Sequence, residues 1–258
     1  WKNYQKLDVF SWAEKRMAEG LIDNLGFSFH DDYSVFEDIV TGYDHWAMAQ
    51  IQYNYIDINY QAGRKGLKLA ADRGLAVVVM EPLRGGMIAK DPPPEPVAEV
   101  WAKSGRDWSA VAWALNWVWD QPEVSLALSG MSAMDHVEEN LALASQSKVG
   151  ILTEEDHAVI AEVRDKYSSL APIPCTGCEY CLPCPNGVAI PTIFEIYNEA
   201  VTFDAWGQGR FAYNSPSLID KQADLCIECG ECEDVCPQNI EIINWLAAAH
   251  DALAMPPA

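Results

Sequence analysis

Eight cysteines give the sequence its clearest chemical signal. All of them lie between Cys175 and Cys236, and residues 1–174 contain none. They form two groups, each followed by a proline: Cys175, Cys178, Cys181 and Cys184, with two residues in every interval, and Cys226, Cys229, Cys232 and Cys236, with three residues in the last interval. The second spacing is that of bacterial ferredoxins, in which short loops wrap three thiolates around a [4Fe–4S] cluster. We therefore predict two [4Fe–4S] clusters, with all eight cysteines as ligands.

Two other uses of the cysteines are less favoured. Zinc sites with four thiolates usually consist of two separated Cys-x2-Cys pairs rather than one run. Disulfides between cysteines this close in tight loops would be strained. In two-cluster ferredoxins the fourth cysteine of each run ligates the other cluster, and carrying this over places Cys236 with the first group and Cys184 with the second. The first group has two residues instead of three before Cys184, so the cluster that Cys184 serves is left open.

The charge of the chain narrows the classes of partner. The 258 residues carry 17 basic and 38 acidic side chains, a net charge of −21. Such a surface repels nucleic acids and anionic membranes, so we expect neither as a partner. Half of the residues are apolar, which is enough for a sizeable core. No uninterrupted apolar run reaches the roughly 18 residues that a membrane span needs, and no signal peptide is recognisable, so we expect a cytoplasmic protein.

The cysteines and the acidic charge also divide the chain in two. Residues 175–258 carry 2 basic and 12 acidic side chains, so about half of the net charge lies in less than half of the residues. The segment Ala171–Pro174, with two prolines, stands directly before the first cysteine. We predict one domain over residues 1–172 and a second over residues 173–258.

The elements that must position these residues alternate through the first domain. The apolar periodicity predicts helices at 4–18, 31–40, 60–73, 109–119, 131–145 and 153–170, and strands at 21–29, 46–53, 75–80 and 124–128. The apolar run Leu75–Met80 suits a strand buried on both faces, and residues 91–96, with four prolines, predict an extended loop. Such alternation is typical of a parallel sheet covered by helices, either a small open sheet or half of an eight-stranded barrel. Between the cysteine groups, residues 190–198 read as helical.

Six ordered blocks of the first domain carry a resemblance to a known family: Leu25–Ser28, Gln50–Asn54, Val79–Gly86, Ser109–Val118, Ser129–Ser132 and Val137–Leu141. In this order and spacing they resemble the aldo-keto reductases, and the whole chain is similar to the iron–sulfur branch of that family, which carries a C-terminal ferredoxin domain. The resemblance implies strands five to eight of a (β/α)8 barrel, with the site at the C-terminal ends of the strands. A mostly helical ferredoxin-like domain with two [4Fe–4S] clusters then follows.

The resemblance also implies a cofactor site, although no catalytic residue can be assigned. The family's catalytic Asp, Tyr, Lys and His belong to the first four strands, and no residue here matches them. NAD(P)H is the cofactor that the family uses, and a flavin is left open. The candidate cofactor-binding residues are Ser28 and Gln50 at the nicotinamide amide, Met80 in place of the stacking aromatic ring, Arg84 and Gly85 with Gly86 at the pyrophosphate, Ser129 and Gly130 beyond the eighth strand, and Glu139 and Asn140 at the adenine.

The sequence is compatible with two functions of different classes. The first is an oxidoreductase that acts on a small carbonyl or related substrate, with two clusters relaying electrons to or from its site or a redox partner protein. A hydride donor delivers two electrons at once, so a flavin or a partner mediates, or the clusters serve a different half-reaction. The alternative is an electron-transfer protein in which the barrel is a scaffold or docking surface without nicotinamide chemistry. A third reading is a chain that is inert by itself, with its first half lost or supplied in trans.

The resemblance also bears on the choice between NAD and NADP. Gly130 and His136 stand where the family usually has the basic residues that bind the 2′-phosphate, which argues against a strong NADP preference.

Overall fold

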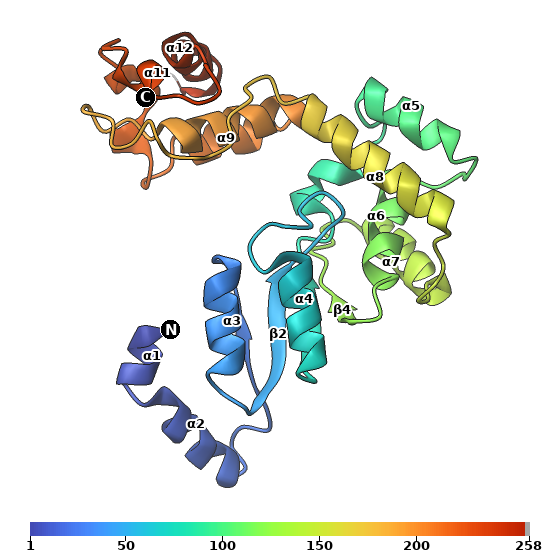
Figure 1. The fold of residues 1–258 in the computed structure, drawn as a ribbon. Coiled ribbons are helices and arrows are strands. Elements are labelled where there is room, and N and C mark those ends of the chain that lie inside the picture. The colour runs from blue at the N-terminus through green and yellow to red at the C-terminus, as the bar shows by residue number, and fades with distance from the viewer. Residues whose placement is uncertain (256–258) are drawn as a thin grey trace. The chain divides into compact units, whose positions relative to one another are not determined.

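The computed structural model describes residues 1–255, and the chain packs into two compact units, Trp1–Glu162 and Val163–Ala258 (Figure 1). The division falls within helix α8 (Glu154–Ser169). The domain boundary predicted at 172/173 lies beyond the end of that helix, before helix α9 (Ile190–Thr202).

Four parallel strands form the centre of the first unit. They are β1 (Leu25–Ser28), β2 (Trp46–Gln52), β3 (Ala76–Met80) and β4 (Val124–Ala127), and they pair in chain order. The helices that connect or follow them are α3 (Tyr33–Thr41), α4 (Gly63–Asp72), α5 (Glu95–Lys103), α6 (Ala110–Trp119) and α7 (Met134–Gln146). The parallel sheet and its alternation with helices confirm the prediction from the sequence.

The two faces of this sheet differ in burial. Successive side chains of a strand point to opposite faces, and the side chains of Ile51, Val77 and Val79 on one face are fully buried. Helices α4 and α6 contact the strands (Figure 1). On the other face Val78 and Met80 are only partly buried and Leu126 is 48% exposed. The prediction that the run 75–80 is buried on both faces is therefore wrong, because helices cover only one face of β3.

Two local predictions from the sequence also need correction. The helix expected over residues 4–18 is two helices, α1 (Lys2–Lys6) and α2 (Val9–Ala18), because Asp8 adopts the left-handed conformation with φ 52°, which Asp tolerates better than most residues. The loop expected over 91–96 ends early, because α5 begins at Glu95 and takes Pro96 into its first turn. Proline is accepted there since the first backbone N–H groups of a helix have no partner within it.

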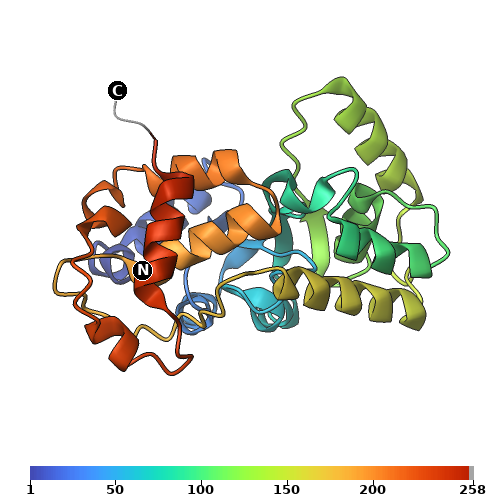
Figure 2. The ribbon, with the colours of Figure 1, turned by 90° about the horizontal axis from the view of Figure 1, so that it is seen from above.

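The second unit contains helices and loops, and residues 163–255 include no strand. Helix α9 contacts both α10 (Trp206–Tyr213) and α12 (Ile242–Leu253) (Figure 2). Two short 3₁₀ helices, η2 (Ile219–Lys221) and η3 (Ala223–Leu225), and the short helix α11 (Glu231–Asp234) carry the chain between α10 and α12. The helical prediction for residues 190–198 is confirmed by α9. Within residues 1–255, none of the helices has the length and apolar character that crossing a membrane requires.

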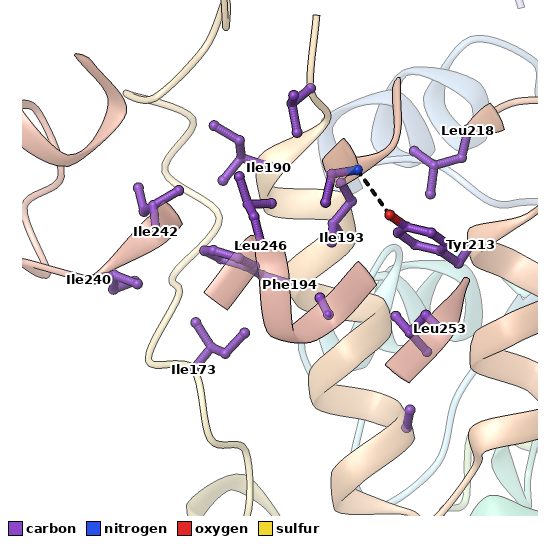
Figure 3. Packing of buried hydrophobic residues seen from close by; sticks show 14 residues of the cluster. Ile173, Ile190, Ile193, Phe194, Tyr213, Leu218, Ile240, Ile242, Leu246 and Leu253 are labelled. Carbon is purple, nitrogen blue, oxygen red and sulfur yellow. Dashed lines mark hydrogen bonds between the residues drawn. The ribbon is translucent and has the colours of Figure 1, made fainter. Parts of the chain in front are cut away.

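The core of the second unit forms where these helices meet. Ile193 and Phe194 of α9 pack in one buried cluster with Leu246 and Leu253 of α12 and with Tyr213 of α10 (Figure 3). Six cysteines, Cys175, Cys181, Cys184, Cys226, Cys232 and Cys236, lie against this cluster. The core therefore supports both cysteine groups.

Candidate iron–sulfur centres and cofactor site

The two cysteine groups share one backbone pattern. In each group the residue before the second cysteine and the residue after it have a positive φ: Gly177 at 66° and Glu179 at 63° in the first group, Glu228 at 56° and Gly230 at 80° in the second. Positive φ reverses the local direction of the chain. Both loops therefore coil in the same way, as segments that wrap three thiolates around a common centre must.

The structure divides the eight cysteines between two hollows of the second unit. Cys236 lies in the smaller hollow with Cys175, Cys178 and Cys181, against the apolar side chains of Ile190 and Phe194. Cys184 lies in a cavity of about 400 Å³ with Cys226, Cys229 and Cys232, and Cys181 also reaches its wall. This is the grouping that crossed ligation requires, with the fourth cysteine of each run beside the other group.

Electrostatic effects link Cys181 to Cys236 as well as to its own run, and link Cys232 to Cys226 and Cys229. Burial raises the pKa of the Cys181 thiol, and the neighbouring Cys175, Cys178 and Cys236 raise it further. Burial raises the pKa of Cys232 to about 11, with further contributions from Glu233, Cys226 and Cys229. Four thiolates so close together repel one another, so they need positive charge between them to stay ionised. Iron ions supply such charge.

The donor set fits a [4Fe–4S] cluster at each hollow. All eight cysteines are free thiols. Among residues 1–255, no three His, Cys, Asp or Glu side chains converge tightly enough to hold one metal ion. A cluster does not require such convergence, because each thiolate binds a different iron at a different corner of the cube. Thiolates are also the ligands that iron–sulfur centres select.

The sheet of the first unit brings the predicted nicotinamide residues to one edge. Ser28, at the end of β1, pairs with Gln50 of β2, and the Gln50 Nε2 lies 3.6 Å from the Met80 Sδ at the end of β3. Ser28 is exposed, whereas Gln50 and Met80 are partly buried. These three side chains therefore meet at the C-terminal edge of the sheet, where ligands bind in folds of this class.

Arg84, the predicted pyrophosphate ligand, is already paired in this structure. Its Nε donates to the Asp57 Oδ2 at 3.0 Å, and the two side chains are only 18% and 10% exposed. The same carboxylate oxygen accepts from the amides of Gln52 at 3.2 Å and Asn54 at 3.0 Å. The sequence interpretation missed Asp57. The turn after β2 holds Asp57 in place, because Asn54 Oδ1 accepts from the Asp57 backbone N–H at 2.9 Å.

The loop around Arg84 has glycines where a ligand could approach the backbone. Gly85 and Gly86 have φ values of 62° and 86°, and a Cβ atom on Gly86 would meet no heavy atom within 4 Å. The carboxylate Oε2 of Glu81 lies 3.6 Å from the place of a Cβ atom on Gly85. With Asp57 and Glu81 beside Arg84, this loop is acidic on balance, which weakens its attraction for an anion.

The two residues predicted to bind the adenine, Glu139 and Asn140, form hydrogen bonds with other side chains of the first unit. The Asn140 side chain is buried and its Nδ2 donates to the Ser129 Oγ at 3.2 Å. Glu139 Oε1 accepts from the hydroxyl of Ser109 at 2.8 Å. That hydroxyl also accepts from the Ala112 N–H at 3.0 Å and so caps helix α6. Gly130, next to Ser129, is exposed, with no heavy atom within 4 Å of a Cβ position.

Comparison with known proteins agrees with this fold and these cysteines. Residues 2–165 match the aldo/keto reductase family, and residues 174–241 match the 4Fe-4S dicluster domain. The chain belongs to the aldo/keto reductase family. The resemblance drawn from the sequence blocks is thereby confirmed, as is the iron–sulfur domain that follows them.

Relatives of this aldo/keto reductase chain are longer than the chain itself. An uncharacterized oxidoreductase of Schizosaccharomyces pombe is 30% identical over 137 residues, which are 53% of this chain and 42% of the relative. An aldo-keto reductase of Bacillus halodurans is 21% identical with a TM-score of 0.47, over 58% of this chain and 53% of that one. A thermostable aldo-keto reductase is 22% identical with a TM-score of 0.45, over 59% and 53% of the two chains. The chain spans about half the length of these proteins.

Proposed function

We propose that this chain is the cluster-bearing part of an oxidoreductase of the aldo/keto reductase type. Its four strands correspond to strands five to eight of a (β/α)8 barrel, and its second unit is a helical ferredoxin-like domain. The site at the C-terminal edge of the sheet acts on a small carbonyl or related compound. Two [4Fe–4S] clusters relay electrons between that site and a redox partner protein in the cytoplasm.

The observation that carries this proposal is the division of the eight thiols between two hollows of the second unit. When bound, a [4Fe–4S] cluster accepts or releases one electron at a time. Ile190 and Phe194 line the first hollow and Ile190 and Leu246 line the second, while Cys178 and Cys229 are exposed. At the sheet edge, the Gln50 amide is placed to donate a hydrogen bond to a carboxamide or carbonyl oxygen. NAD(P)H or a flavin is the group proposed there.

Anaerobic titration with dithionite tests the relay. Each cluster takes up one electron, so we expect the loaded chain to consume about two electrons while its visible absorbance bleaches. The control is the same sample after a chelator has removed its iron. Its uptake of electrons from dithionite is measured in the same way. A chain that keeps its iron and takes up no electrons would contradict the proposal.

Two observations favour the second candidate, an electron-transfer protein whose sheet is a scaffold. The guanidinium of Arg84 is neutralised by Asp57, and Met80 supplies no ring for stacking on nicotinamide. A dinucleotide would then bind only weakly at the C-terminal edge of the sheet. In this reading the clusters exchange electrons with partner proteins, and the first unit provides a surface for them.

Asp57→Asn separates the two candidates. If the sheet edge is a dinucleotide site, removal of the carboxylate charge leaves Arg84 more available to phosphate. We expect NADH to bind about three- to tenfold more tightly, as suits a charge-assisted contact. Calorimetry or quenching of tryptophan fluorescence measures the affinity.

Asp72→Asn is the matched control for that measurement. It removes the same charge from an exposed ion pair on α4, in which the Lys68 Nζ lies 3.0 Å from the Asp72 Oδ1. We expect no change in NADH affinity. If neither the original chain nor Asp57→Asn binds NADH at millimolar concentration, the scaffold reading is favoured and the nicotinamide site is wrong.

A further inference from the structure

A buried tyrosine connects the core of the second unit to the second cysteine group. Tyr213 is 0% exposed, and its hydroxyl accepts from the Ala223 backbone N–H at 2.9 Å (Figure 3). The same hydroxyl oxygen lies 2.8 Å from the His250 Nδ1. A backbone N–H can only donate, so the hydroxyl oxygen accepts from Ala223 and its own proton is available for the imidazole nitrogen.

The connection continues to a cysteine sulfur. Ala223 is the first residue of η3, and its carbonyl accepts from the Cys226 N–H at 3.0 Å. The Sγ of Cys226 in turn accepts from the Glu228 N–H at 3.4 Å. The segment is held a second time, because the Gln222 Nε2 donates to the Tyr213 carbonyl at 2.9 Å. The backbone around Ala223 cannot shift without breaking these bonds, and Cys226 would shift with it.

The first cysteine group is held by an equivalent device. Asn198 of α9 bonds to both backbone groups of Ile173: its Oδ1 accepts from the N–H at 3.0 Å, and its Nδ2 donates to the carbonyl at 2.8 Å. The same Ile173 carbonyl accepts from the Cys175 N–H at 2.8 Å. In both groups, then, a side chain of a core helix fixes one residue just upstream. That residue holds the backbone N–H of the first cysteine.

We propose that Tyr213 and Asn198 are positioning residues, Tyr213 for the second cluster and Asn198 for the first. The first cysteine of each group starts the loop that coils around the cluster, so its position sets the place of the next two thiolates. A cysteine that is free to move strains its bond to iron and lets solvent reach the sulfur. Solvent and hydrogen bonding at the sulfurs determine both the potential of a cluster and its resistance to iron loss. This inference rests on the two clusters of the proposed function.

Removal of each side chain should affect one cluster only. Tyr213→Phe keeps the ring in the core but leaves the Ala223 N–H buried without an acceptor, and Asn198→Leu removes both bonds to Ile173. We expect iron to leave the second cluster about tenfold faster in Tyr213→Phe, and the first about tenfold faster in Asn198→Leu, the factor expected for a buried polar group left unsatisfied. Iron release to a chelator gives the rates, and a redox titration followed by electron paramagnetic resonance gives each midpoint potential. The potential of the affected cluster should shift while that of the other stays.

Tyr167→Phe is the matched control. Tyr167 is 2% exposed in the same unit, and its ring packs tilted against Phe203, with ring centroids 5.0 Å apart. It lies on α8, a helix that carries no cysteine. We expect it to leave both clusters unchanged. His250→Gln, which keeps the Ala223 bond intact, should give a smaller change than Tyr213→Phe. Equal effects of Tyr213→Phe on both clusters, or none on either, would overturn the inference. Absence of clusters from the original chain would instead contradict the proposed function itself.

Discussion

Cys236→Ala should abolish the cluster of the first group and spare that of the second, although Cys236 is the last residue of the second run. Cys236 lies in the hollow of Cys175, Cys178 and Cys181, where its charge contributes to the raised pKa of Cys181. Loss of one of four thiolates exposes an iron to solvent. We expect about half of the iron to be lost. The reduced protein should lack the same resonance signal that Cys175→Ala lacks.

Cys184→Ala is the reciprocal test. Cys184 lines the cavity of Cys226, Cys229 and Cys232, so its loss should remove the other signal, the one missing in Cys226→Ala. Each pair of variants thus serves as the control for the other. If Cys236→Ala loses the signal that Cys226→Ala loses, the ligands are not crossed, and the grouping by hollows does not describe ligation.

The second large effect is an absence of turnover. The chain by itself should show no oxidation of NADH or NADPH with aldehydes above background, because the family's proton-donating tyrosine and its tuning groups have no counterpart here. General acid catalysis contributes roughly 10²–10⁴-fold to rates of this kind. The tyrosines after β2 do not replace it: Tyr53 and Tyr55 are 0% exposed, and Tyr60 is 47% exposed on the surface. A steady-state assay with a panel of aldehydes measures the rate.

Reduction by dithionite is the internal control for that assay, since it needs the cysteines alone. A preparation that bleaches with dithionite but does not turn over aldehydes shows that the two activities are separate. Robust turnover would show that a catalytic group has been overlooked. His30, exposed just beyond the end of β1, would then be the first residue to replace.

The sequence was most informative where chemistry restricts spacing. Three ligands of each cluster lie within a few residues of one another in a tight loop, so the cysteines of each run could be read directly from their spacing. The strands were readable because apolar runs such as Val77–Val79 alternate with helices of regular period. The site residues Gln50 and Met80 could be placed at one edge because parallel strands end on the same side.

Other features depend on contacts between distant residues and left little trace in the sequence. The pairing of Asp57 with Arg84 joins residues 27 positions apart, and the bond between Tyr213 and His250 joins residues 37 apart. Neither has a periodic pattern. The break at Asp8 was missed because apolar residues keep a helical period on both sides of it, and one residue with positive φ does not disturb that period. The open face of β3 was missed because its residues Val78 and Met80 are as apolar as Val77 and Val79, which point to the buried face.

Iron and acid-labile sulfide, determined on protein purified without oxygen, test the central claim most directly. Two [4Fe–4S] clusters held by the eight cysteines of the second unit predict about eight irons and eight sulfides per chain. The protein should also show a broad visible absorbance that dithionite bleaches. Stoichiometric zinc with no labile sulfide would contradict the account, because the thiolates would then hold single ions that carry no electrons.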